Sequence, residues 1–83
     1  MGLMRLDLSN TRVSDEGLAH LKTLTQLDTL YLNHTQVSDE GLAHLKTLTG
    51  LRWLYLTDTR VTKQGVKELR KALPLCVILW DGK

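Results

Sequence analysis

The chain has 83 residues, the length of one small domain. Its formal net charge of +2 is too small to indicate a nucleic acid or an anionic membrane as its partner. Its apolar fraction of 42% and charged fraction of 24% are typical of a globular protein, although leucine supplies much of the apolar set and phenylalanine is absent. A single cysteine, Cys76, excludes an internal disulfide, and the lack of a long apolar run or a signal-peptide pattern favours a cytoplasmic location unless the chain is a fragment.

The predicted elements alternate between short strands and short helices along the chain. The first strand spans Arg5–Leu8, where leucines alternate with polar residues as in a strand with one buried face. A helix follows, with Ser14 at its N-cap position and with three leucines spaced three apart, Leu18, Leu21 and Leu24. The same patterns then recur in order: strand residues Leu30 and Leu32, an N-cap at Ser38 with helix leucines Leu42, Leu45 and Leu48, strand residues Leu54 and Leu56, an N-cap at Thr62 with a helix closed by Pro74, and strand residues Ile78 and Trp80.

The spacing of these elements is an internal repeat of 24 residues. Val13–Gln36 and Val37–Arg60 align without gaps and agree at 18 of 24 positions, and the segment from Val61 keeps the register more loosely, with Leu75 at a repeated leucine position. A repeat of this length indicates stacked units, because one unit cannot bury its leucines without a similar neighbour on each side. Glycine recurs at each helix opening, at Gly17, Gly41 and Gly65, which indicates that the backbone comes close to another group there. We expect that group to be the strand-side loop of the same or the neighbouring unit.

Written as one unit, the pattern L-x-x-L-x-L-x-x-T-x-V-[ST]-D-x-G-L resembles the leucine-rich repeat, and it is most similar to the variant of F-box-type proteins and long bacterial arrays. The resemblance implies an α/β fold, a right-handed solenoid of about three strand–helix units plus a closing strand, with a parallel sheet on the concave face and helices on the convex face. We expect a single domain over residues 1–83, or alternatively the C-terminal end of a longer array. Threonine replaces the usual Asn or Cys after each strand, and we expect its hydroxyl to bond the turn backbone at Thr11, Thr35 and Thr59.

The positions at which the repeats differ indicate where function lies. The two best-matched units differ at six pairs of positions, all between the end of the helix and the turn after the strand. Strand alternation points every second side chain out of the concave face, where aromatic residues cluster. We therefore predict a surface that binds a protein partner of unknown identity, made of Thr29, Tyr31, Asn33, Trp53, Tyr55 and Thr57. The alternative is that the aromatic side chains shield the sheet and pack on one another across strands.

Other chemistries find little support in the sequence. His20 and His44 lie one repeat apart, but no cysteine or carboxylate completes a metal site, and no nucleophile accompanies His34 and Asp58, which we interpret as a surface pair. We therefore predict no enzymatic activity, no catalytic or metal-binding residue and no cofactor. Polyanion binding is a distant alternative, because a solvated outer face also explains the basic residues of the last unit, Lys63, Lys67, Arg70, Lys71 and Lys83.

The N-terminal strand supports a second functional hypothesis, a structural or self-associating element. Arg5, Leu6, Asp7 and Leu8 are expected to form an edge strand with unpaired backbone groups, beside the exposed leucine side of the first helix. Natural proteins rarely leave such an edge open. Either a longer array continues upstream or two copies meet edge to edge, and we predict a homodimer or higher assembly built on Met1–Leu8 and the first helix.

Overall fold

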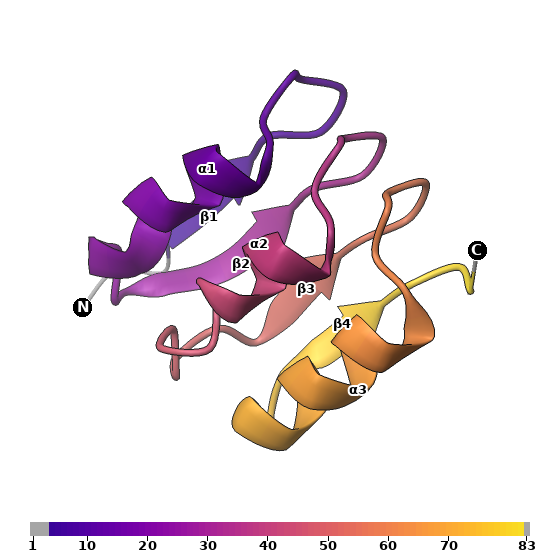
Figure 1. Cartoon of the computed structure of the whole chain (residues 1–83). Coiled ribbons are helices and arrows are strands. Elements are labelled where there is room, and N and C mark those ends of the chain that lie inside the picture. The colour runs from indigo at the N-terminus through magenta and orange to yellow at the C-terminus, as the bar shows by residue number, and fades with distance from the viewer. Residues whose placement is uncertain (1–3, 83) are drawn as a thin grey trace.

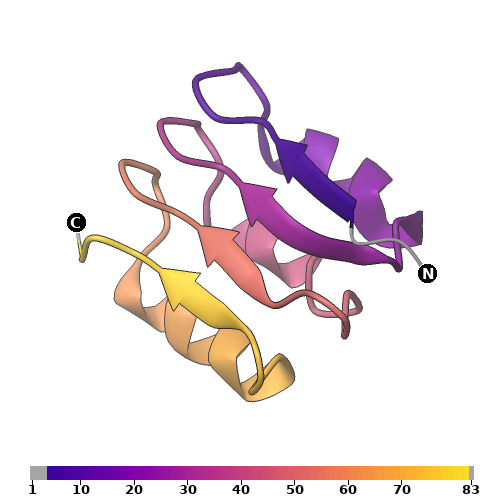
Figure 2. The same ribbon diagram turned by 180° about the vertical axis from the view of Figure 1, so that it is seen from behind.

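The computed structural model describes residues 4–82, which form a four-stranded parallel sheet with helices on one of its faces (Figure 1). The strands follow the chain order across the sheet, and the view from behind shows the other face of the sheet without helices (Figure 2). The elements are β1 (Met4–Asp7), α1 (Asp15–Ala19), the 3₁₀ helix η1 (His20–Thr23), β2 (Leu27–Tyr31), α2 (Asp39–Ala43), β3 (Trp53–Tyr55), α3 (Lys63–Ala72) and β4 (Val77–Leu79). The predicted α/β solenoid, with about three strand–helix units and a closing strand, is confirmed, and its crossovers have the right-handed sense usual for parallel strands.

Neighbouring strands pair in the register that the repeat predicts. Leu30 of β2 lies beside Leu54 of β3, which in turn lies beside Ile78 of β4. On the other side of β2, Leu30 lies beside Leu6 of β1. Side chains one repeat apart therefore form straight rows across the sheet.

Rows of leucines form the core between the sheet and the helices. Leu30 and Leu54 of the strands and Leu18 and Leu42 of the helices are at most 1% exposed. Full burial of one such side chain stabilises a fold by about 1.5–3 kcal/mol. Because each row is continued by the next unit, the core of one unit is covered by its neighbour.

The first two helices are shorter than the leucine spacing predicted. α1 ends at Ala19 and continues as the 3₁₀ helix η1, and α2 is followed by turns. Leucines spaced three apart match the three residues per turn of a 3₁₀ helix better than the 3.6 of an α-helix, so tight turns keep these leucines on the core side. In α3 the apolar residues Val66, Leu69 and Leu73 are spaced three and four apart, and α3 is correspondingly a longer, regular helix.

The aspartates that begin α1 and α2 each bond the next unit. Asp15 Oδ1 accepts a hydrogen bond from the Ser38 amide at 2.7 Å, and Asp15 Oδ2 accepts one from the Ser38 hydroxyl. Asp39 accepts the same two bonds from Thr62, with 2.8 Å for the amide. Ser14 and Ser38 occupy the predicted N-cap positions but make no side-chain cap bond, whereas the Thr62 hydroxyl also accepts the amide of its own helix, from Gly65.

The helix glycines leave room for these aspartates. A Cβ on Gly41 would overlap the carboxylate of Asp15, and one on Gly65 would overlap the carboxylate of Asp39. The predicted close approach is therefore confirmed at both positions. The predicted neighbour was wrong, because the group that comes close is the carboxylate at the start of the preceding helix and not a strand-side loop. At Gly17 the neighbour is a side chain of the same unit.

Threonine hydroxyls close the turns after the strands, as predicted. Each donates to the carbonyl oxygen three residues earlier, at 2.6, 2.7 and 3.0 Å for Thr11, Thr35 and Thr59. The residue before each threonine has a positive φ of 60°, 59° or 54°, at Asn10, His34 and Asp58. The chain thus reverses in the same left-handed conformation once per repeat.

Candidate functional site

The side of the sheet that carries no helices keeps the name concave face (Figure 2). The strand residues of the predicted surface alternate with leucines that pack in the core with the helices, so they belong to this face: Thr29, Tyr31, Trp53 and Tyr55. The other two predicted contact residues, Asn33 and Thr57, lie in the turns that follow β2 and β3. Two rows of side chains cross this face in register: the first contains Arg5, Thr29, Trp53 and Val77, and the second contains Asp7, Tyr31, Tyr55 and Leu79. The alternate residues of the same strands point into the core. The sequence-based assignment of faces is therefore confirmed.

The two tyrosines of the second row pack on each other. The ring centroids of Tyr31 and Tyr55 are 4.5 Å apart with an angle of 19° between the ring planes, which is a stacked pair. Both side chains are half-buried. Cross-strand packing, the alternative reading of these aromatic residues, thus accounts for part of their surface.

Trp53 is the aromatic side chain of this face that remains free of such a pair among residues 4–82. It is 44% exposed, although it belongs to a strand whose next residue, Leu54, is fully buried. Its neighbours along the first row are Thr29 on one side and Val77 on the other. Trp53 therefore projects from the sheet with apolar surface still available.

A hollow of about 320 Å³ lies on one side of Trp53. Thr29 is only 5% exposed and forms part of this hollow, where its hydroxyl donates to Asp28 Oδ2 at 3.0 Å. Thr29, one of the predicted contact residues, is therefore largely covered and offers a partner little surface. The residues lining the hollow are Arg5, Asp28, Thr29, Tyr31, Trp53 and Tyr55.

A second and larger hollow, of about 700 Å³, lies on the other side of Trp53, where the loops lead into the strands. Val77 and Leu75 line it and are 43% and 75% exposed. Leu75 stands at a repeated leucine position, and its exposure contradicts the register expected there. The longer α3 shifts the chain by one residue, so that the amide of Cys76 bonds the Leu73 carbonyl where the amide of Leu51 bonds that of Leu48.

Val77 and Leu75 were missing from the predicted binding surface. Val77 carried a usable signal, because it occupies the same row as Trp53 in the repeat. Leu75 carried none, since its exposure depends on the one-residue shift at the end of α3. Cys76 takes the buried position instead and is 9% exposed.

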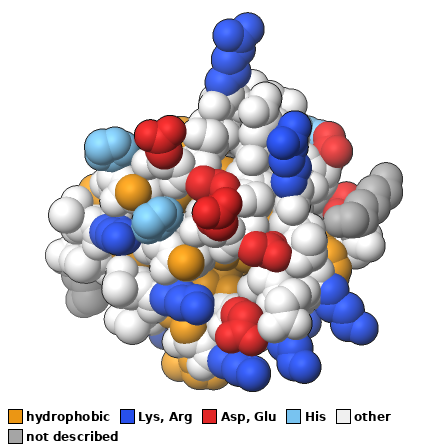
Figure 3. Space-filling view, viewed as in Figure 1, with side chains coloured by type: hydrophobic (Ala, Val, Ile, Leu, Met, Phe, Trp, Pro, Cys, Tyr) orange, Lys and Arg blue, Asp and Glu red, His pale blue; other side chains and the backbone are white. Residues whose placement is uncertain are grey.

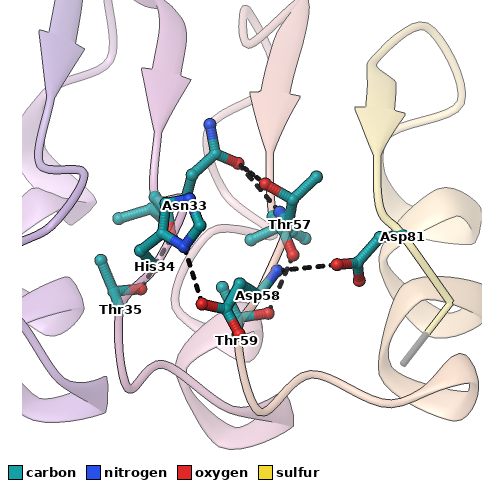
Figure 4. A network of polar contacts seen from close by, with 9 residues as sticks. Asn33, His34, Thr35, Thr57, Asp58, Thr59 and Asp81 are labelled. Carbon is teal, nitrogen blue, oxygen red and sulfur yellow. Dashed lines mark hydrogen bonds and ion pairs between the residues drawn. The ribbon is translucent and has the colours of Figure 1, made fainter.

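A ladder of polar contacts joins the turns at the carboxyl ends of the strands (Figure 4). Asn33 Oδ1 accepts hydrogen bonds from the Thr57 amide at 2.9 Å and from the Thr57 hydroxyl at 2.7 Å. The Asp58 amide donates to Asp81 Oδ2 at 3.0 Å. Asn33 and Thr57, both predicted contact residues, therefore already hydrogen-bond each other. Fewer of their polar groups remain free to bond a partner.

The pairing predicted for His34 and Asp58 is confirmed in the same ladder. His34 Nδ1 lies 2.7 Å from Asp58 Oδ2, and the two side chains are 53% and 70% exposed (Figure 4). Exposed pairs of this kind contribute little to stability, roughly 0–1 kcal/mol. The geometry thus fits a surface pair between adjacent turns.

The self-association edge predicted at Arg5–Leu8 falls on β1, which is an edge strand of the sheet. Arg5 and Asp7 are exposed. Five apolar residues beside this edge are only partly buried, Leu6, Leu8, Val13, Leu21 and Leu24, whereas their counterparts one repeat later are buried. Residues Met1–Leu3 of the predicted interface lie outside the described part of the chain.

The described residues hold no cluster of three or more His, Cys, Asp or Glu side chains with the proximity that a metal site needs. Burial raises the pKa of the Cys76 thiol from 9.0 to about 11, which makes the thiolate rare at neutral pH. No helix within residues 4–82 has both the length and the apolar character needed to cross a membrane.

A comparison with known protein families finds a match. A family model described as leucine-rich repeat matches residues 3–22 and 19–46, which together span more than half of the chain. No curated protein matches the chain. The matched residues contain β1, β2 and the helices that follow them.

Proposed function

This chain belongs to the leucine-rich-repeat family, and from that premise we propose that it is a protein-binding module that holds its partner on the concave face. Repeats of this family generally mediate protein–protein interaction and typically act as non-enzymatic scaffolds. Stacked units present an extended surface of this kind, and the side chains of successive strands supply its specificity. The partner is a protein, and the chain performs no catalysis on it.

The observation that carries the proposal is the position of Trp53. Its side chain is 44% exposed and stands between two hollows of about 320 and 700 Å³. Tryptophan is among the residues that contribute most to binding when they are centred in an interface. Val77 and Leu79, each close to 40% exposed, extend the apolar surface along the next strand.

Shielding of the sheet explains Trp53 less well than it explains the tyrosines. Tyr31 and Tyr55 stack on each other, so each covers the other. Trp53 has Val77 as its neighbour on β4, and that residue is itself 43% exposed. A shielding role would leave both side chains less exposed, whereas a binding role uses the surface that remains.

The test is a pull-down from the source proteome, followed by calorimetric titration of the captured protein against wild-type and Trp53→Ala chains. Because Trp53 is the central anchor, we expect its loss to weaken binding by about 2 kcal/mol or more, close to thirtyfold in Kd. Lys22→Ala, on the exposed surface of η1, is the matched control and should leave Kd unchanged. Equal affinity of the Trp53→Ala and wild-type chains would reject the concave face as the binding surface.

A second candidate function is self-association through β1. The partly buried apolar residues beside this edge, whose counterparts in the next unit are buried, favour it. Two copies that meet at this edge would cover these side chains and pair the open backbone groups of β1. This interface would leave the concave face free, so the two functions are compatible.

A further inference from the structure

The outer flank of α3 differs in charge from the matching flanks of the earlier helices. Lys63 stands one repeat after Asp39, and Lys67 stands one repeat after Ala43. Asp39 bonds the next unit, whereas Lys63 and Lys67 are exposed. Basic side chains gather over the part of the molecule that contains α3, at the lower edge of the space-filling view (Figure 3).

A groove of about 430 Å³ runs along this flank. The half-buried ring of Trp80 lines it together with Val66, whose own side chain is only 1% exposed in the core. Four cationic side chains complete the lining, Lys63, Lys67, Arg70 and Lys71. The groove thus combines an apolar floor with a basic rim.

The basic rim is not neutralised from within α3. The single carboxylate of α3, that of Glu68, lies 3.9 Å from Lys71 Nζ. The same carboxylate also accepts a hydrogen bond from the side-chain amide of Gln64 at 2.9 Å. The separation between Glu68 and Lys71 is at the limit of an ion pair, and both of these side chains are largely exposed. Three of the four cations have no ion-pair partner within residues 4–82.

The indole N–H of Trp80 is buried and has no hydrogen-bond acceptor within the described residues. Such a donor is unfavourable in a folded protein unless an acceptor can reach it. Trp80 stands one repeat after Leu56, a fully buried core leucine, so the repeat itself requires no polar group at this position.

We propose that this groove binds an acidic amphipathic helix of a partner protein, which lies beside α3 as the next member of the helix layer. α1, α2 and α3 already pack side by side (Figure 1). The residues that line the groove belong to α3, apart from Trp80, which directly follows β4. Apolar side chains of the bound helix cover the ring of Trp80 and the aliphatic stems of the lysines, and its carboxylates meet the basic rim. A solvated outer face would need only the charges, whereas the apolar groove and the unpaired indole donor fit a bound segment.

An amphipathic peptide fits the groove better than a nucleic acid does. Nucleic-acid interfaces are polar and lined by phosphate contacts, whereas this groove has an apolar floor between its cations. The site is separate from the concave face, and loss of one leaves the other intact. The two proposals can therefore fail independently.

The test titrates a tryptophan-free synthetic helix of about 14 residues, with leucine at every third or fourth position and glutamate between, into the Trp53→Phe chain. Trp80 is then the only tryptophan, and we expect its fluorescence to shift as the peptide binds. Lys67→Glu with Arg70→Glu should raise Kd about tenfold or more. The matched pair, Lys22→Glu with Lys46→Glu, changes net charge equally outside the groove and should alter Kd less than about twofold.

Further controls distinguish specific binding in this groove from general attraction of anions to the basic side chains. A peptide with glutamine in place of glutamate and a single-stranded oligonucleotide should both bind about tenfold more weakly than the acidic helix. A chain with Lys67→Ala and Arg70→Ala keeps the test valid if the reversed charges unfold α3, which circular dichroism will reveal. An unchanged Trp80 signal, an equal effect of the two charge-reversal pairs, or equal binding of the oligonucleotide would each overturn the proposal.

Discussion

Trp53 and Leu54 are adjacent in the chain and lie on opposite faces of β3. Leu54 is fully buried, so Leu54→Ala should lower the free energy of unfolding by about 2–5 kcal/mol through lost contacts and a cavity. Trp53 is 44% exposed, so Trp53→Ala should cost less than about 1 kcal/mol. Urea unfolding followed by circular dichroism measures both. If the two variants unfold at the same urea concentration, the assignment of faces is wrong.

Cys76 gives the chain a pH dependence at alkaline pH. Burial raises its pKa from 9.0 to about 11, so the unfolded state loses the thiol proton at a lower pH than the folded state. The resulting stabilisation is complete below pH 9 and is lost as the pH rises to about 11. We expect the free energy of unfolding to fall by roughly 2–3 kcal/mol over this range because of Cys76.

The measurement compares urea unfolding of wild-type and Cys76→Ala chains at several pH values from 8 to 11. Lysine and tyrosine ionise in the same range and affect both chains, so the difference between the chains isolates the thiol. That difference should narrow as the pH rises. A constant difference would mean that the thiol ionises equally in the folded and unfolded states.

For single residues, the sequence predicted which face of the sheet a side chain points to better than it predicted how exposed that side chain is. The period of two in each strand correctly separated Trp53 from Leu54, because alternation depends only on the local backbone. The burial of Thr29 and the exposure of Leu75 could not be predicted in the same way. The first depends on large neighbours from adjacent strands, and the second depends on the extra length of α3.

Each junction between units depends on an aspartate and a glycine. Asp15 accepts the amide and hydroxyl of Ser38, so Asp15→Ala leaves a partly buried amide without its acceptor. We expect a loss of about 1–3 kcal/mol in the free energy of unfolding. Glu16→Ala removes the same charge from an exposed neighbour and should cost less than about 0.5 kcal/mol. Thermal and urea unfolding of both variants compares them, and equal losses would show that the bond to the next unit contributes nothing.

Glycine substitutions test the same junction from its other side. A Cβ on Gly41 would overlap the Asp15 carboxylate, so Gly41→Ala should displace that carboxylate and destabilise the chain. A Cβ on Gly50 would meet only the Thr25 carbonyl, at an ordinary 3.6 Å. Gly50→Ala should therefore be neutral or slightly stabilising.

At the scale of elements, the repeat predicted the strands, the helix starts and the need for small residues at those starts. It did not predict that the aspartate of one unit bonds the serine of the next. The serine and the aspartate occur in both matched units. The sequence alone does not tell whether an aspartate bonds the serine of its own unit or that of the next. That choice depends on how the stacked helices are placed: Asp15 bonds Ser38 of the next unit, and the start of its own helix has no side-chain cap bond from Ser14.

For the whole molecule, the period of the leucines was sufficient to predict the solenoid and the order of its sheet. Each unit repeats the same strand, turn and helix start, so stacking the units side by side buries the leucines of all of them. The two outer faces of the stack have no such constraint. The flank of α3 became basic, whereas the flank beside β1 kept its apolar side chains.

The prediction for the whole molecule is that β1 mediates a homodimer. Parallel pairing alternates along a strand, and the Leu8 amide bonds Tyr31 of β2, so the amides of Arg5 and Asp7 point toward the open edge. Light scattering at micromolar concentration should give about twice the 9.4 kDa mass of the monomer.

Arg5→Pro removes one outward amide without touching the bonds to β2 and should shift the population toward monomer. Leu21→Glu, which charges the half-buried apolar surface beside the edge, should do the same, whereas Lys46→Glu should have no effect. A wild-type chain that stays monomeric at millimolar concentration would exclude self-association and leave protein binding on the concave face as the function to pursue.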